Sequence, residues 1–144
     1  MSLGHVQNQF YLHGLIVLAI GLLGGLPFAA AIRSENGREV AWRVVHAGGA
    51  SGGTMVIAMG SMLGHLALSD TWNTIELVIQ VAASYALIGG MVLAAATGER
   101  GLGKRRGPAT PMWRVVQVLY QSGVVLQLIS VGILLVACAR RLGD

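Results

Sequence analysis

One histidine, His46, stands beside a run of very small residues in an apolar segment of the chain. The segment, residues 42–58, has the sequence WRVVHAGGASGGTMVIA. On a helix, Gly49, Ala50 and Gly53 share a face with His46, because neighbours recur at three and four residues. A ligating imidazole above a surface without bulky side chains suits a planar cofactor. We therefore predict His46 as the axial ligand of a haem iron, with Gly49, Ala50 and Gly53 facing the porphyrin.

Other interpretations of the histidines stay open. His46 could be a hydrogen-bonded residue near a helix end, without any ligand. His13 and His65 could instead bind haem as a pair, because both are expected about one turn inside the same membrane face on adjacent helices. That protein would be an electron carrier, although simple packing also explains each histidine. Zinc is disfavoured, because no His, Cys, Asp or Glu cluster of suitable spacing lies on one helix face.

The composition points to a membrane. Hydrophobic residues make up 54% of the 144 residues and charged residues only 11%, whereas a soluble domain carries roughly 25% charged residues. The net charge of +4 does not indicate nucleic acid, because all the basic residues lie outside the apolar runs, where loops meet anionic lipid headgroups. The single cysteine, Cys138, excludes an internal disulfide.

Four apolar runs are long enough to cross a bilayer as helices. The predicted fold is therefore an all-α integral membrane protein, a single membrane domain over residues 1–144 with residues 1–8 frayed. The predicted spans are about 9–32, 44–68, 75–96 and 111–139. The first span is too long for a signal peptide and has no basic residue before it.

Local signals mark three points along these spans. Pro27 should kink the first span near its far end. Asn73 and Glu76 are spaced as a capping box for the third span. Thr110 as N-cap with Pro111 at the first helical position should start the fourth.

The basic residues predict the orientation. Eight of the ten lie in the loops over residues 33–43 and 97–114, and the other two are Arg140 and Arg141. Because cytoplasmic loops are enriched in Lys and Arg, these two loops should be cytoplasmic and both termini outside. We expect a multi-pass protein of a bacterial-type inner (plasma) membrane.

Polar side chains at membrane depth usually face a bundle interior or a ligand. They either hydrogen-bond between helices to fix the packing, or line a substrate cavity. In the second case, Tyr85 and Tyr120 are the tyrosines deep enough to act as catalytic donors or acids. The polar positions are Glu76, Gln80 and Ser84 in the third span, and Gln117, Tyr120, Gln121, Gln127 and Ser130 in the fourth.

These residues resemble a known family, the styrene oxide isomerases, which are small four-helix membrane proteins. The second span resembles that family's second-helix motif most closely. The residues that carry the resemblance are Trp42, His46, Gly48, Ala50, Gly53 and the MVIA at 55–58, together with His13-Gly14 and Arg100-Gly101-Leu102.

The resemblance implies a homotrimer with haem b near a subunit interface, bound through His46. It also implies that ferric iron acts as a Lewis acid on an aryl epoxide, which rearranges by a 1,2-hydride shift to an aldehyde. Two positions depart from the family pattern. Gly52 stands where the family has an asparagine, and Met91 where it has a tyrosine, and both positions are thought to line the substrate side of the haem.

The sequence thus predicts a haem-b-dependent membrane epoxide isomerase that takes a small apolar substrate. Arg43 and Arg100 are predicted to pair with the haem propionates, from their depth and charge. Two alternatives remain. One is a haem protein without isomerase activity, which would be an electron carrier, a gas sensor or a haem-handling protein. The other is a cofactor-free packing subunit or small transporter.

Overall fold

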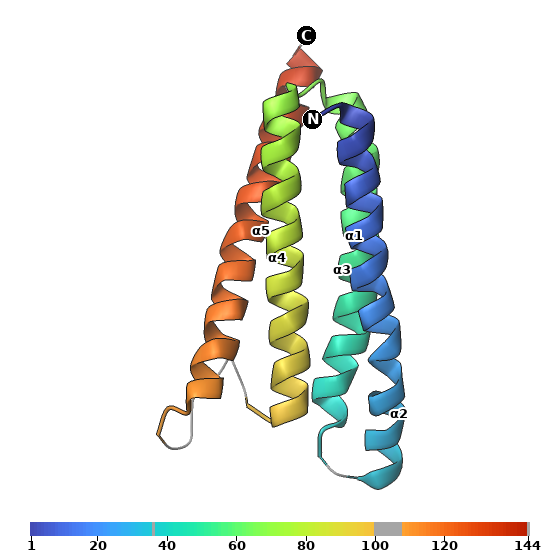
Figure 1. The fold of residues 1–144 in the computed structure, drawn as a ribbon, viewed down its shortest axis with the longest axis vertical. Helices are drawn as coiled ribbons and strands as arrows, with labels where there is room; N and C mark the ends of the chain where they lie inside the picture. The colour runs from blue at the N-terminus through green and yellow to red at the C-terminus, as the bar shows by residue number, and fades with distance from the viewer. Residues whose placement is uncertain (36, 100–107, 144) are drawn as a thin grey trace.

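The computed structural model describes residues 1–35, 37–99 and 108–143. This part of the chain is helical and holds no strand. Its helices are α1 (Leu3–Leu23), α2 (Gly25–Ser34), α3 (Glu39–Leu66), α4 (Asp70–Thr97) and α5 (Pro111–Gly143). α2 continues the line of α1, and the combined rod runs roughly side by side with α3, α4 and α5 (Figure 1).

Three stretches of the described chain are long and apolar enough to cross a membrane. They are Leu3–Ser34, which joins α1 and α2, then Asp70–Thr97 and Pro111–Gly143. These correspond to the first, third and fourth predicted spans. α3 is 28 residues long, but its glycines, serines and histidines lower its mean hydropathy. For this reason α3 is not among the three stretches that meet the criterion for a membrane span.

The N-terminal residues are not frayed, which corrects the prediction for residues 1–8. α1 begins at Leu3, six residues before the predicted start. The reason is packing, since Val6 is fully buried and the Gln7 side chain donates a hydrogen bond to the Gly60 carbonyl at 3.2 Å. The first turns of α1 are therefore docked on α3.

The predicted kink in the first span is confirmed as a break between α1 and α2 at Gly24. Pro27 has no N–H, so it cannot donate to the carbonyl of Leu23, and the regular ladder is interrupted one turn before the proline. This break lies beside His46 and shapes its surroundings.

The other helix starts are partly as predicted. α5 begins at Pro111, and the Trp113 N–H donates to Thr110 Oγ1 at 3.0 Å, which confirms the cap. The capping box at Asn73 and Glu76 is wrong. α4 begins at Asp70, where Ser69 is the N-cap and accepts from the Trp72 N–H at 3.4 Å. Ser69 comes first in the chain and has the extended backbone that an N-cap needs.

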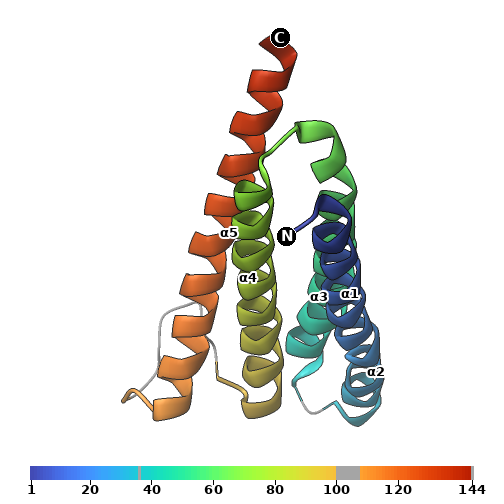
Figure 2. The same cartoon turned by 45° about the horizontal axis from the view of Figure 1, so that its top comes forward.

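The helices pack as two close pairs, α1 with α3 and α4 with α5, and α4 also contacts α1 and α3. Figure 2 shows the same pairing after rotation. The α1–α3 contact is made by a glycine seam, which consists of Gly14 and Gly21 on α1 with Gly49 and Gly53 on α3. A Cβ at Gly49 would lie 2.5 Å from the Cα of Gly21, and a Cβ at Gly14 would lie 2.9 Å from the Gly53 carbonyl oxygen. Only residues without a side chain allow two backbones so close.

Candidate functional site

His46 has a defined tautomer in this structure. It lies in α3 and is half-buried, and its Nδ1 is 3.0 Å from the carbonyl oxygen of Gly21 on α1. A carbonyl oxygen can only accept a hydrogen bond, so Nδ1 carries the proton. In the neutral ring, Nε2 then holds the free lone pair. A metal bound by this tautomer would therefore be ligated through Nε2.

The imidazole ring is also held from the other side of the helix break. A Cβ at Gly25 would lie 3.2 Å from Nδ1, so a larger residue where α2 passes the ring would press against the imidazole. The Phe28 ring stacks on the imidazole with centroids 6.4 Å apart and an interplanar angle of 25°. Gly21, Gly25 and Phe28 therefore form a socket, which fixes the ring plane as well as the tautomer.

This arrangement fits a haem better than a metal held by protein side chains alone. No group of three His, Cys, Asp or Glu residues that could hold a metal ion occurs in the described ranges. A porphyrin supplies its own equatorial nitrogens, so one oriented histidine is enough. A ligating histidine usually donates its other N–H to a carbonyl or carboxylate, as His46 does to Gly21.

The predicted porphyrin-facing surface needs a correction, because α1 covers most of it. Gly49 and Gly53 are buried in the glycine seam, and a Cβ at Gly53 would clash with the backbone nitrogen of Leu18. The missing side chains serve helix packing within the chain. Ala50 is half-buried at the border, where its backbone nitrogen meets Gly21.

An open strip of small residues, not predicted from the sequence, lies on the adjoining side of α3. Ala47, Ser51, Thr54 and Ala58 are exposed there. The Ser51 and Thr54 hydroxyls donate back to carbonyls of their own helix at 2.9 and 3.0 Å, so the strip is flat and largely apolar. The sequence does indicate this strip, because small residues recur there at intervals of three and four residues, next to the glycine face.

The predicted propionate partners are only partly visible. Arg43 is exposed one turn before His46, on the side of α3 that carries the open strip. Arg100 lies outside the described residues. Pairing of either arginine with a propionate stays a prediction.

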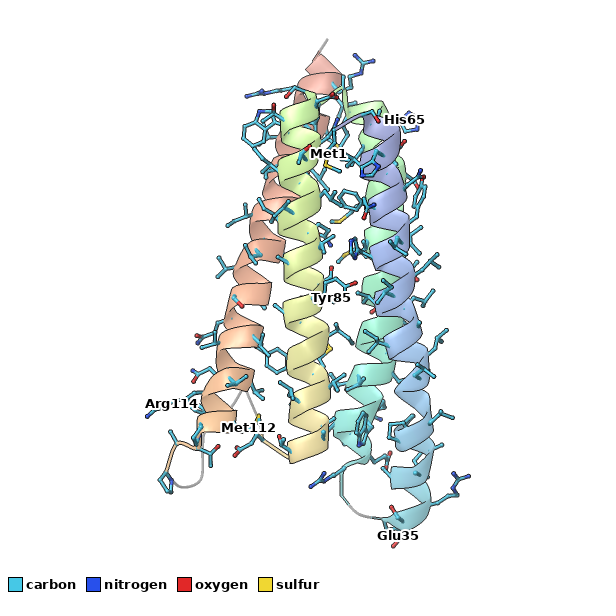
Figure 3. All side chains as sticks on the ribbon, in the orientation of Figure 1. Met1, Glu35, His65, Tyr85, Met112 and Arg114 are labelled. Atoms are coloured by element: carbon cyan, nitrogen blue, oxygen red, sulfur yellow. The ribbon has the colours of Figure 1, made fainter. Side chains whose placement is uncertain are left out.

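His13 and His65 are not brought together, which corrects the alternative haem pair. His13 Nδ1 lies 2.9 Å from the Tyr85 hydroxyl, and the two rings meet edge to face. His65 is exposed in the last turn of α3, near the end of the bundle (Figure 3). Gly14 packs beside Ile57, eight residues from His65, so the two histidines differ in depth by roughly 12 Å.

The two predicted tyrosines occupy separate places. Tyr85 lies on the side of α4 that faces α1 (Figure 3), with its hydroxyl engaged by His13. Tyr120 of α5 lines a cavity of about 510 Å³ at the end of the bundle near the α2–α3 loop, and Met91 lines the same cavity. A shared active site for both tyrosines is therefore not formed within one chain.

The polar side chains between α4 and α5 pair mainly with one another, although one carboxyl oxygen of Glu76 is buried without a hydrogen-bond partner among the described residues. The Gln80 and Gln127 side chains exchange two hydrogen bonds at 3.3 and 3.1 Å. Ser130 lies 2.8 Å from the Gln80 side-chain oxygen and also contacts the Glu76 carboxyl. Glu76, Gln80 and Ser130 are fully buried. This geometry supports the packing interpretation of these residues and not a cavity lining.

Replacing Ser130 with alanine should test this contact. The change removes the hydroxyl between Glu76 and Gln80, so two buried polar groups lose a partner, and we expect the free energy of unfolding to fall by about 1–2 kcal/mol. Ser122→Ala is the matched control, because its hydroxyl bonds only to Leu119 of its own helix. Thermal unfolding in detergent measures both. Equal midpoints for the two variants would contradict the packing role.

The chain matches the protein-family model described as Styrene oxide isomerase over residues 6–139. The match leaves out only five residues at each end. A search of curated proteins finds no match.

Proposed function

The chain belongs to the styrene oxide isomerase family, and on that premise we propose that it is a haem-b-dependent membrane isomerase converting an aryl epoxide to an aldehyde. The observation that carries the proposal is the hydrogen bond from His46 Nδ1 to the Gly21 carbonyl. It leaves the Nε2 lone pair free to ligate a metal, and the open strip lies on the adjoining side of α3. When bound, ferric haem would supply a Lewis acid for the epoxide oxygen.

The chain's own residues would hold and shelter the group. The socket of Gly21, Gly25 and Phe28 sets the direction in which His46 presents Nε2. Ala47, Ala50 and Thr54 of α3 would contact the group, in place of the buried Gly49 and Gly53. Arg43 would meet a propionate at the membrane edge. The apolar surroundings would keep water from a carbocation-like centre on the substrate.

The substrate side would come from a neighbouring subunit. Met91 packs against Gly48, since a Cβ there would lie 2.9 Å from the Met91 sulfur. Gly48 is two residues from His46 and so projects to the opposite side of α3, and Gly52 is also turned well away from His46. One chain therefore cannot present His46 and the Gly52 and Met91 positions to one haem. This supports a homo-oligomer, which we propose to be the trimer that the family resemblance implies.

We further propose α3 as the fourth span. Its 28 residues would extend roughly 42 Å, enough for a hydrocarbon core of about 30 Å. No Lys, Arg, Asp or Glu occurs from Val44 to Leu66. With four spans, the basic loops would face the cytoplasm of a bacterial-type inner membrane and both termini would lie outside.

Tyr120 is the better placed of the two tyrosines to replace the family's tyrosine, because it lines the same cavity as Met91. Tyr120→Phe should therefore lower kcat for styrene oxide by about tenfold or more. Tyr85→Phe should act more weakly, because its hydroxyl is held by His13 and not directed into that cavity. The two rates are compared at equal haem content. A larger loss in Tyr85→Phe would reverse this assignment.

The function itself is tested by an optical spectrum and one product assay. Detergent-purified protein should show a Soret band, and membranes given styrene oxide should form phenylacetaldehyde. Haem-loaded protein that forms no aldehyde would favour the second candidate function, an electron carrier, sensor or haem-handling protein, which the departures at Gly52 and Met91 already suggest. A colourless protein at high purity would overturn both and favour a packing subunit or transporter.

A further inference from the structure

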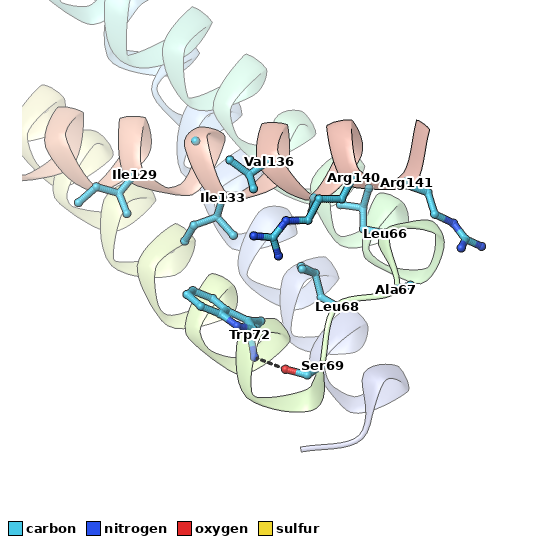
Figure 4. Close-up of a pocket in the computed structure, with 12 residues that line it drawn as sticks. Leu66, Ala67, Leu68, Ser69, Trp72, Ile129, Ile133, Val136, Arg140 and Arg141 are labelled. Carbon is cyan, nitrogen blue, oxygen red and sulfur yellow. Dashed lines mark hydrogen bonds between the residues drawn. The ribbon is translucent and has the colours of Figure 1, made fainter. Parts of the chain in front are cut away.

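A groove of about 740 Å³ lies where α5 ends and α4 begins (Figure 4). Its α5 wall is apolar and includes Ile129, Ile133 and Val136. Trp72 of α4 forms the facing side, and its side chain is half exposed at 49%. The groove is far along the bundle from His46 and takes no part in the proposed haem site.

Two arginines lie at one end of this groove. In Figure 4 the Arg140 side chain extends over the groove towards Ile133 and Trp72, whereas Arg141 points away at the rim. Neither guanidinium forms an ion pair with a carboxylate in the part of the chain that the structure describes. A guanidinium binds phosphate through two parallel N–H donors, so Arg140 is suited to a phosphate group above the apolar wall.

The polarity of the groove changes with depth as that of a lipid does. Arg140 and Ile129 are eleven residues apart on one helix, which is roughly 16 Å. The hydrocarbon core of a bilayer is about 30 Å thick, so this distance corresponds to about one leaflet. Arginine and tryptophan side chains prefer the headgroup layer, and the isoleucines lie below them. A free phosphate would use only the arginine end, whereas a lipid would fill the length.

We propose that this groove binds an anionic phospholipid. Arg140 contacts the phosphate, with Arg141 adding positive charge nearby. One acyl chain lies along Ile129, Ile133 and Val136, against the indole of Trp72. A lipid with the same chains and a choline headgroup binds less well, because its positive group lies near the two arginines.

The test compares dioleoylphosphatidylglycerol with dioleoylphosphatidylcholine on the full chain, by native mass spectrometry from detergent. Wild-type protein should retain the phosphatidylglycerol preferentially. Arg140→Gln should weaken its retention about fivefold, as expected for one basic residue near an anionic surface. The matched control is Arg114→Gln, since Arg114 is exposed at the other end of the same helix.

A second variant keeps both charges and fills the groove. Ile133→Trp should reduce retention of both lipids, because the added ring occupies the path of the acyl chain. Trp72 gives an independent readout in a Trp42→Phe/Trp113→Phe background. Its fluorescence should be quenched by phosphatidylglycerol with brominated chains, and much less so when Arg140→Gln is added.

Four results would overturn the proposal. An equal loss of phosphatidylglycerol retention in Arg114→Gln and Arg140→Gln would mean that binding depends only on the overall charge of the protein. Complete displacement of lipid by inorganic phosphate would indicate a small-anion site. Dissociation of the oligomer in Ile133→Trp with lipid retained would make the groove a subunit interface. A raised KM for styrene oxide in Ile133→Trp with lipid binding unchanged would make it a substrate pocket.

Discussion

His46→Ala should purify without haem, retaining less than about a tenth of the wild-type Soret absorbance per protein. The variant removes Nε2, the nitrogen that the Gly21 carbonyl leaves free for a metal. The other three histidines are placed elsewhere: His5 is in the first turn of α1, His13 is hydrogen-bonded to Tyr85, and His65 is at the far end of α3. Even loss of a residue that only orients a ligand costs about 10- to 100-fold in metal affinity, so loss of the ligand itself should cost more.

Two variants sharpen this experiment. His65→Ala is the matched control, because it also removes an imidazole from α3 but from an exposed position outside the socket. It should keep its full colour. Gly25→Ala leaves His46 present and pushes a methyl group towards its ring, where a Cβ would lie 3.2 Å from Nδ1. Reduced haem content in Gly25→Ala would show that the socket matters as well as the ligand. Full haem in His46→Ala would contradict the assignment.

The helices could be predicted from local features of the sequence, and the same features single out His46 as the candidate ligand. Apolar runs indicate where helices can form in a membrane. Because proline has no N–H, Pro27 interrupts a helix and Pro111 is suited to begin one. His46 is singled out because a polar imidazole is costly inside an apolar membrane helix, so its presence there indicates a function. These inferences use only the chemistry of neighbouring residues, and the helix ends in the structure lie within six residues of the predicted ones.

The use of the glycine face could not be predicted from one helix alone. The sequence shows where side chains are missing on α3, but either a cofactor or another backbone can take that space. The second half of the signal was on α1, where Gly14 and Gly21 lie on the side that meets Gly53 and Gly49 of the antiparallel α3. Comparing the two helices would have favoured the seam.

The error in the histidine pair has a different cause. An assumed start near residue 9 places His13 about one turn inside the membrane edge. With α1 beginning at Leu3, His13 lies almost three turns into the helix. The estimated membrane depth of a residue such as His13 is counted from the start of its helix, so an error in that start shifts the estimated depth by the same amount. The start in turn depended on Val6 and Gln7 docking on α3, a tertiary contact that no local pattern shows.

Gly53→Ala should destabilise the protein by about 2–4 kcal/mol, whereas Gly52→Ala should be neutral or slightly stabilising. In an isolated helix the two changes are equivalent, and each would favour the helix by up to about 1 kcal/mol. At Gly53 the new Cβ meets the backbone of α1, 2.6 Å from the Gly14 carbonyl oxygen and 2.7 Å from the Leu18 Cα. At Gly52 the nearest atom is a Val17 methyl at 4.0 Å.

A backbone cannot move aside as a side-chain end can, so α1 and α3 must separate to admit the methyl group at Gly53. Separation also lengthens the hydrogen bond from His46 to Gly21, so Gly53→Ala should lose both thermal stability in detergent and Soret absorbance, and Gly52→Ala neither. The opposite pattern is equally informative. If Gly53→Ala unfolded at the wild-type temperature but no longer bound haem, the glycine face would be open to the porphyrin, as first predicted, and α1 would not lie against it.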